Sequence, residues 1–209
     1  MGKIILILTI FFSCNYIFFE DIYAGNPSTQ AQAADTSKIA EYLNLRLDYS
    51  KSPQYNPYDT EVHNITEACD KLMGEGKFKE AIDKAKIGLE KDRYNIHLLV
   101  CLASAYRKIG DIENADKYRK LWVGLISSIL ASGDGKSAKS AFVVISVDEE
   151  YAVLEVLNLR RTIQRHVVID GANFDILEVE KQAPASKFDL YFNIDIPFKW
   201  LSQKYGAGE

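Results

Sequence analysis

The stretch SGDGKS, residues 132–137, contains the Gly-Lys-Ser tripeptide of loops that cradle phosphate groups. Such a loop has a glycine five positions before its Gly-Lys pair, but that position is Leu130 here. It also needs a strand before it and a helix after it, so that backbone amides converge on the phosphates. Here the order is reversed. We therefore expect a helix stop and turn, with Gly133 in the left-handed conformation that often ends a helix, and no nucleotide binding.

Histidine is the side chain best suited to metal binding and proton transfer near neutral pH, and the chain has three. None of them lies in a zinc-protease motif, a Cys/His cluster or a nucleophile elbow. His63 and His97 are the two that share one structural position, but a metal site needs a third ligand. We expect no metal and no other cofactor.

A second candidate for chemistry is an acidic cluster in the C-terminal third of the chain. Asp148, Glu149 and Glu150 follow one another, and the pattern predicts that they lie in a loop between two strands, with Asp195 in another segment. Such carboxylates can hold calcium or act as an acid and base pair. A solvated polar loop is the other interpretation. The cluster keeps open a metal-dependent or acid/base enzyme as the alternative function.

Residues 1–24 combine one early cation, Lys3, with an apolar run and a small residue at Ala24, the pattern of a secretory signal peptide. Polar residues at 13–15 interrupt the run, so it is poorly suited to span a membrane. Lipidation at Cys14 and a retained anchor remain as alternatives, and all three interpretations predict an exported protein of the periplasm or cell envelope. Residues 25–36 are small and polar, which indicates a flexible spacer.

Residues 37–132 are predicted to form a helical repeat region. Gly76 recurs as Gly110 and Ala81 as Ala115, each 34 residues later, with apolar positions repeating around them. This period resembles the tetratricopeptide repeat, a helix-turn-helix unit. Glycine lets the chain turn between the two helices, and alanine lets their backbones approach. The apolar stripe of the second copy continues to about Leu130, which predicts one long helix that docks on the C-terminal region.

Cys69 and Cys101 are the two cysteines beyond the N-terminal segment. In an oxidising compartment such a pair can form a disulfide. They occupy different offsets of the 34-residue repeat, which predicts that their side chains point in different directions. We expect two small buried side chains rather than a bridge.

Repeats of this kind mostly serve as scaffolds, and the first helices of neighbouring units would face a shared groove. The residues expected there are candidates for binding another envelope protein or a peptide: His63, Asp70, Met73, His97, Arg107 and Lys108. The net charge of −4 and the lack of a basic stripe argue against a nucleic-acid partner. A non-enzymatic interaction or scaffold module is therefore the leading hypothesis.

Residues 133–205 are predicted to form an antiparallel β region, because from Ala141 the apolar period changes from 3.6 to about 2. Asp170 and Gly171 lie between two such runs, the typical turn of a hairpin. Pro197 suits the first turn of a short C-terminal helix. Helices followed by strands predict an α+β fold.

Three stretches carry a resemblance to a known family: SPQYNPYD at 52–59, GDGKSAKSAFVVISVDEEYAVL at 133–154 and YFNIDIPFKWL at 191–201. In these stretches the chain is similar to the bacterial domain-of-unknown-function 4919 family. The resemblance covers most of residues 38–204. It implies an exported or envelope protein and brings no activity with it.

Overall fold

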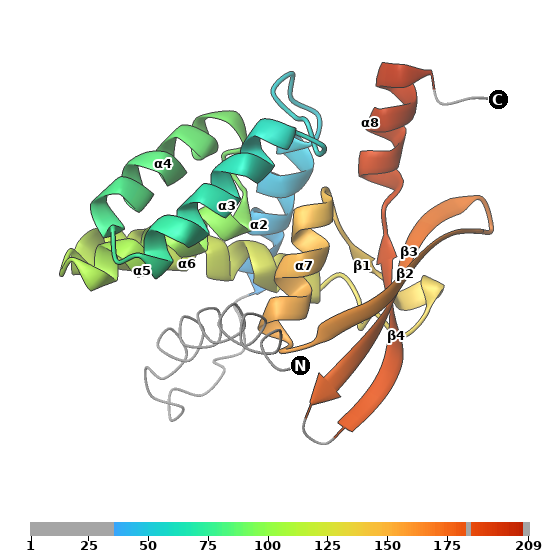
Figure 1. Cartoon of the computed structure of the whole chain (residues 1–209). Coiled ribbons are helices and arrows are strands. Elements are labelled where there is room, and N and C mark those ends of the chain that lie inside the picture. The colour runs from blue at the N-terminus through green and yellow to red at the C-terminus, as the bar shows by residue number, and fades with distance from the viewer. Residues whose placement is uncertain (1–35, 183–184, 207–209) are drawn as a thin grey trace, which may run out of the picture.

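The structure is a computed structural model that describes residues 36–182 and 185–206. The predicted signal peptide, the lipidation alternative and nearly all of the spacer lie outside the described residues. Seven helices and a four-stranded sheet make up the described part (Figure 1). Their order is α2 (Thr36–Tyr49), α3 (Thr60–Gly74), α4 (Phe78–Lys91), α5 (Ile96–Lys108), α6 (Ile112–Leu130), the short 3₁₀ turn η1 (Ala138–Ser140), β1 (Phe142–Val143), α7 (Val147–Val156), β2 (Arg160–Ile169), β3 (Ala172–Gln182), β4 (Ala185–Asn193) and α8 (Asp195–Tyr205).

Two helical hairpins, α3–α4 and α5–α6, follow the 34-residue period. Gly76 and Gly110 connect the helices of each pair with φ angles of +73° and +82°, which L-residues with a side chain rarely adopt. Ala81 and Ala115 are buried in the core that the hairpins share. The turn and the close approach predicted from the sequence are therefore both present in each hairpin.

Helix α6 continues beyond its hairpin and joins the two halves of the molecule. Its last turns bury Trp122, Leu125 and Ile129 in a core that also contains residues of α7 and the sheet. Helix α2 packs along α6 as well. The long docking helix predicted from the apolar stripe is confirmed, and it ends at Leu130.

The sheet has the strand order β1-β4-β3-β2, antiparallel except that β1 runs parallel to β4. The predicted turn joins β2 to β3, with φ angles of +52° at Asp170 and +82° at Gly171. The inner face buries Leu177, Leu190 and Phe192 against the helices. The α+β prediction is confirmed, and α7 lies between the hairpins and the sheet (Figure 1).

Helix α7 occupies the stretch for which the sequence predicts an acidic loop followed by a strand. Ser146 caps this helix, with its Oγ accepting a hydrogen bond from the Glu149 backbone N–H at 3.4 Å. Three acidic residues in the first turn favour a helix because they face the positive end of the helix dipole. Short apolar runs do not distinguish a buried helix from a strand by period alone. The prediction was wrong for this reason.

The turn after α6 also differs from the prediction. Ala131, the residue that caps the C-terminus of the helix, has right-handed geometry, and the positive φ angle, +70°, is at Gly135 rather than Gly133. Gly133 has a different role, because a Cβ atom there would lie 2.2 Å from the carbonyl oxygen of Ser140. Glycine is needed at 133 so that two backbone segments can approach.

Replacing Gly133 with Val is therefore expected to lower the free energy of unfolding by about 1–3 kcal/mol, as overpacking of a rigid contact does. Lys136→Ala is the control within the same turn, since the Lys136 ammonium is exposed and lies 3.6 Å from the Asp134 carboxylate. It should change stability by less than about 0.5 kcal/mol. Denaturant unfolding of both variants measures the difference, and equal stabilities would contradict the close backbone approach.

Candidate functional site

The four carboxylates of the predicted acidic cluster have different surroundings in the structure. Asp148 accepts a hydrogen bond from the Asn95 amide at 2.9 Å, and Asp195 accepts one from the Asn173 backbone N–H at 2.7 Å. Glu149 and Glu150 are both buried, with different surroundings. Within residues 36–182 and 185–206, no group of three or more His, Cys, Asp or Glu side chains could hold a metal ion.

Glu149 forms a fully buried ion pair with Arg46 of α2. The guanidinium donates from Nε to Oε1 at 2.7 Å and from Nη2 to Oε2 at 2.6 Å. It also donates to the Ser128 hydroxyl and to the Val143 carbonyl, at 3.2 and 2.8 Å. The backbone N–H of Ile145 donates to Glu149 Oε2 at 2.8 Å. This network connects α2, α6, β1 and α7, and its role is structural.

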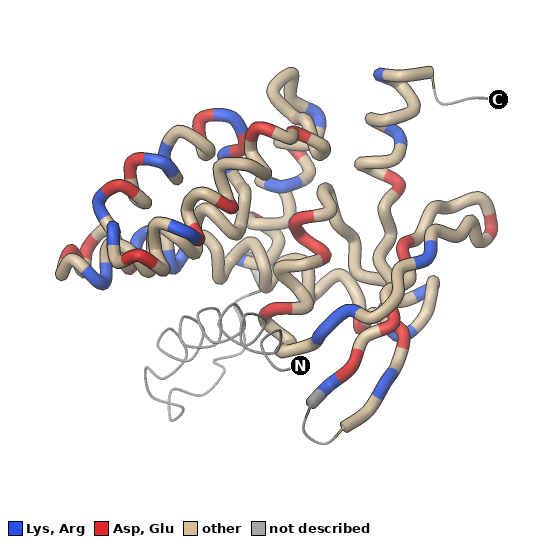
Figure 2. The backbone as a smooth tube through the Cα atoms, in the orientation of Figure 1, with Lys and Arg blue, Asp and Glu red and all other residues tan. Residues whose placement is uncertain are grey.

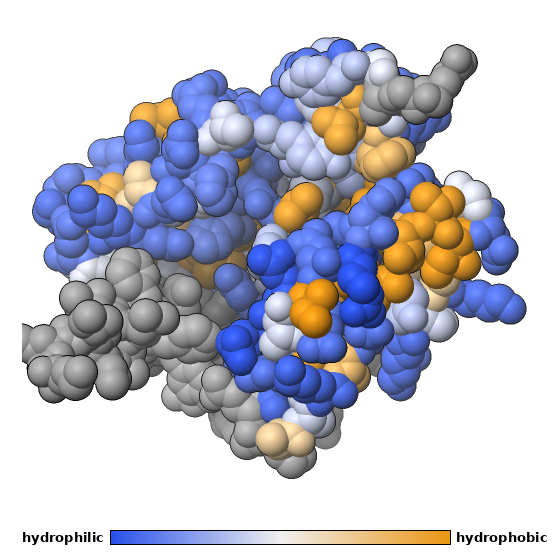
Figure 3. Space-filling view, turned by 45° about the vertical axis from the view of Figure 1, so that its right-hand side comes forward, coloured by the Kyte–Doolittle hydropathy of each residue, from blue (hydrophilic) through white to orange (hydrophobic). Residues whose placement is uncertain are grey.

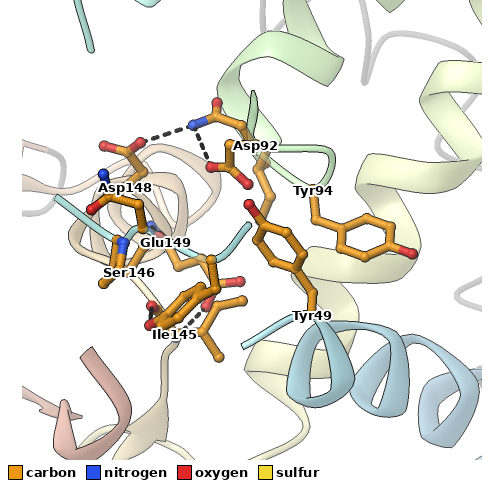
Figure 4. A pocket seen from close by; sticks show the side chains of 12 residues that line it. Tyr49, Asp92, Tyr94, Ile145, Ser146, Asp148 and Glu149 are labelled. Carbon is orange, nitrogen blue, oxygen red and sulfur yellow. Dashed lines mark hydrogen bonds between the residues drawn. The ribbon is translucent and has the colours of Figure 1, made fainter. Parts of the chain in front are cut away.

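A small pocket lies beside this ion pair, where α2, the connection from α4 to α5 and the start of α7 meet (Figure 4). The volume open to a water-sized molecule is about 10 Å³, roughly one water molecule. Sites for cofactors or drug-sized ligands are typically about 300–1,000 Å³. The pocket is lined by aromatic, polar and acidic side chains that include Tyr49, Tyr55, Asp92, Tyr94, Asn95 and Asp148.

Asn95 bridges two carboxylates of this pocket. Its amide nitrogen lies 3.2 Å from an oxygen of Asp92 and 2.9 Å from one of Asp148 (Figure 4). Burial raises the pKa of Asp92 to about 6, although its hydrogen bond with Asn95 opposes this. The amide thereby joins the segment between the hairpins to α7, and the pocket is best understood as a polar joint between elements.

Glu150 has no such partners. The residue is only 1% exposed, and neither carboxyl oxygen has a hydrogen-bond partner. Burial and, to a smaller extent, the charge of Asp175 raise its pKa to about 9, although the charge of Arg161 opposes them. The carboxyl group is therefore neutral at pH 7.

Asp175 of β3 is the buried carboxylate beside Glu150, and sequence reasoning missed it. It accepts a hydrogen bond from the Gln164 amide of β2 at 2.7 Å. It lies on the face of the sheet that also carries Leu177 and Val179. The sequence pattern that could have revealed Asp175 is a charged residue at an inward-facing position of a strand in which apolar and polar residues alternate.

The predicted partner-binding residues lie on α3 and α5, and one of them does not reach the surface. Met73 is buried in the hairpin core, so it is not available to a groove. His97 Nε2 is 2.8 Å from Asp70 Oδ1, a contact that joins the two hairpins. Burial lowers the pKa of His97, but the hydrogen bond and charge of Asp70 outweigh it and raise the value to about 9. Lys and Arg are interspersed with Asp and Glu over the two hairpins as a whole (Figure 2), although α5 itself has no acidic residue.

Two further predicted residues, His63 and Arg107, are exposed and have acidic neighbours on the helices. His63 is 3.5 Å from Glu67 in α3, and Arg107 is 3.4 Å from Asp116 in α6. Lys108 follows at the exposed end of α5. These side chains bring both signs of charge to the surface of the hairpins.

Both cysteines are buried, as predicted, but they lie in one shared core although different directions were predicted for them. Cys69 of α3 and Cys101 of α5 are free and buried in the same hairpin core. The hydrogen bond between their thiols lowers the pKa of Cys69 and raises that of Cys101. Offsets within one repeat did not predict this contact, because it depends on how neighbouring hairpins stack.

These features define an α+β protein in which two helical hairpins are joined to a small sheet through buried polar contacts. The family model described as domain of unknown function (DUF4919) matches residues 29–202, and the chain belongs to this family. Neither a curated protein nor a solved structure matches the chain. In the described part of the chain, the helices are all too short or too polar to cross a membrane.

Proposed function

We propose that the chain is an exported, non-enzymatic interaction module of the bacterial cell envelope, with its two hairpins acting as a tetratricopeptide-like scaffold. The observation that carries the proposal is the equivalence of the hairpins. Each places glycine in a left-handed turn and alanine at the helix crossing, 34 residues apart. The signal-peptide pattern of residues 1–24 supports export.

The binding surface in this proposal is the exposed side of α3 and α5. The contact between His97 and Asp70 fixes the two helices relative to each other on that surface. Arg107 and Lys108 add positive charge where α5 ends. A partner segment that carries acidic residues would be attracted to this end, because complementary charges raise both the rate and the specificity of association.

Reversing the charges of this end, with Arg107→Glu and Lys108→Glu together, is expected to weaken capture of the partner from envelope extract at least tenfold. The matched control is Arg119→Glu with Lys120→Glu, an exposed Arg-Lys pair on α6 with the same charge change. Quantitative pull-down with wild-type and both double variants is the measurement. Equal loss in both variants, or undiminished capture by the first, would count against this surface.

The enzyme hypothesis has less support once the acidic residues are placed in the fold. Asp148, Glu149 and Asp195 are each hydrogen-bonded to other side chains or to the backbone. Of the four carboxylates, only Glu150 keeps both oxygens without a partner.

A further inference from the structure

The carboxyl group of Glu150 is buried without a hydrogen-bond partner. Buried polar groups in native proteins almost always have a hydrogen-bond partner, because leaving one without a partner costs about 1–3 kcal/mol. Both oxygens of Glu150 lack one. Its neighbour on the same helix, Glu149, shows that this region of the fold can satisfy a buried carboxylate completely.

A second buried carboxylate, Asp175, increases the negative charge around Glu150. Asp175 is only 7% exposed and has a side-chain partner in Gln164. Glu150 comes from α7 and Asp175 from β3, and each raises the pKa of Tyr58, which burial raises most. Tyr58 belongs to the segment between α2 and α3, so three separate parts of the fold converge here.

Aromatic rings border this region, and two of them already hold cations of the chain itself. Tyr58 packs on Trp200 of α8 with ring centroids 6.0 Å apart. The Lys204 ammonium lies 4.7 Å from the Trp200 ring, and the Arg161 guanidinium lies 5.2 Å from the Tyr151 ring. Aromatic faces attract cations through their quadrupoles, so the border suits a positively charged ligand.

We propose that Glu150 and Asp175 form a binding site for the ammonium group of a primary amine. The ammonium is compact and has three N–H donors, which suits two unpartnered oxygens better than the wide planar fork of a guanidinium does. Tyr58, on which both carboxylates act, is partly exposed, at 37%.

Binding at this site releases one proton. The Glu150 carboxyl is neutral without a ligand, and it pairs with the ammonium only as a carboxylate, so its proton passes to the solvent. The other charged or titratable groups around it are Asp175 on β3, Arg161 on β2, Tyr58 between α2 and α3, and Tyr151 on α7. The site does not depend on the surface of α3 and α5, so the proposed function and this site can fail separately.

Calorimetric titration of the full-length protein at pH 7.5 tests the proposal with two pairs of probes. The first pair is n-butylammonium and the uncharged n-butanol. The second is lysine blocked at both backbone ends and the same compound acetylated at its side-chain nitrogen. We expect saturable binding of at least one charged probe and none of its uncharged counterpart. Binding of n-butylammonium alone would assign the site to free amines, and binding of blocked lysine would assign it to polypeptides.

Titration in two buffers with different ionisation enthalpies counts the protons, and we expect a release close to one per amine. Glu150→Gln should weaken binding at least tenfold. Glu155→Gln is the control, since it makes the same change at an exposed position of the same helix. Circular dichroism verifies that both variants are folded. Absence of saturable binding, no proton release, or equal affinity in the Glu150 variant would overturn the proposal.

Discussion

Replacing Arg46 with Met is expected to lower the free energy of unfolding by about 3–5 kcal/mol, because it leaves the Glu149 carboxylate buried without its cation. The substitution also removes the bonds to Ser128 and Val143, which connect α2 to α6 and β1. Denaturant unfolding measures the loss, and a thermal melt should show a fall of roughly 10 °C in the midpoint.

Two further variants distinguish the contribution of the buried ion pair to stability from that of an ordinary surface ion pair. Arg160→Met removes an exposed ion pair to Glu180 and should cost less than about 1 kcal/mol. Arg46→Met combined with Glu149→Leu removes both buried charges and should recover much of the lost stability. If Arg46→Met costs no more than Arg160→Met, the ion pair does not hold α2 to α7 as we infer.

The second large effect is a loss of stability with rising pH that originates at Glu150. Its pKa is about 9 in the folded protein and near 4.5 when the chain is unfolded. Between these values the folded state keeps a proton that the unfolded state has released, so stability falls as pH rises. A single group contributes at most about 1.4 kcal/mol per pH unit, and we expect a few kcal/mol in total.

Glu150→Gln removes this titrating group, so the free energy of unfolding should depend less on pH between 5 and 9. The measurement is denaturant unfolding of both proteins across that range. Asp92 and His97 add slopes of the same sign, because their pKa values are also raised, to about 6 and about 9. Asp92 acts between pH 3.8 and 6 and His97 between 6.5 and 9, and both remain in the variant. Parallel curves for wild-type and variant would refute the assignment to Glu150.

Exposed apolar side chains on the sheet show what the alternation of apolar and polar residues predicts about a strand and what it does not. Val168 is 62% exposed near the turn between β2 and β3, where Figure 3 shows apolar surface. Alternation correctly indicated strands in this part of the chain, and in the structure Leu177 and Val179 share the buried face of β3. Alternation does not say which face is covered, because that depends on where α7 and α8 pack.

The sequence by itself determined the features that local chemistry controls. Gly76 and Gly110 marked the hairpin turns, since few other residues adopt a positive φ, and Asp170–Gly171 marked the turn between β2 and β3 for the same reason. The apolar stripe predicted that α6 continues to about Leu130, which is its last residue. The α+β class followed from the change in period at Ala141.

Only the tertiary structure decided which polar groups are satisfied. Arg46 and Glu149 are 103 residues apart, and no local pattern relates them. Asp148, Glu149 and Glu150 are adjacent in the chain, but successive residues of a helix point in different directions, so one binds Asn95, one binds Arg46 and one has no partner. Asp175 becomes the neighbour of Glu150 because α7 packs between the hairpins and the sheet, and this packing depends on apolar surface contributed by many distant segments of the chain.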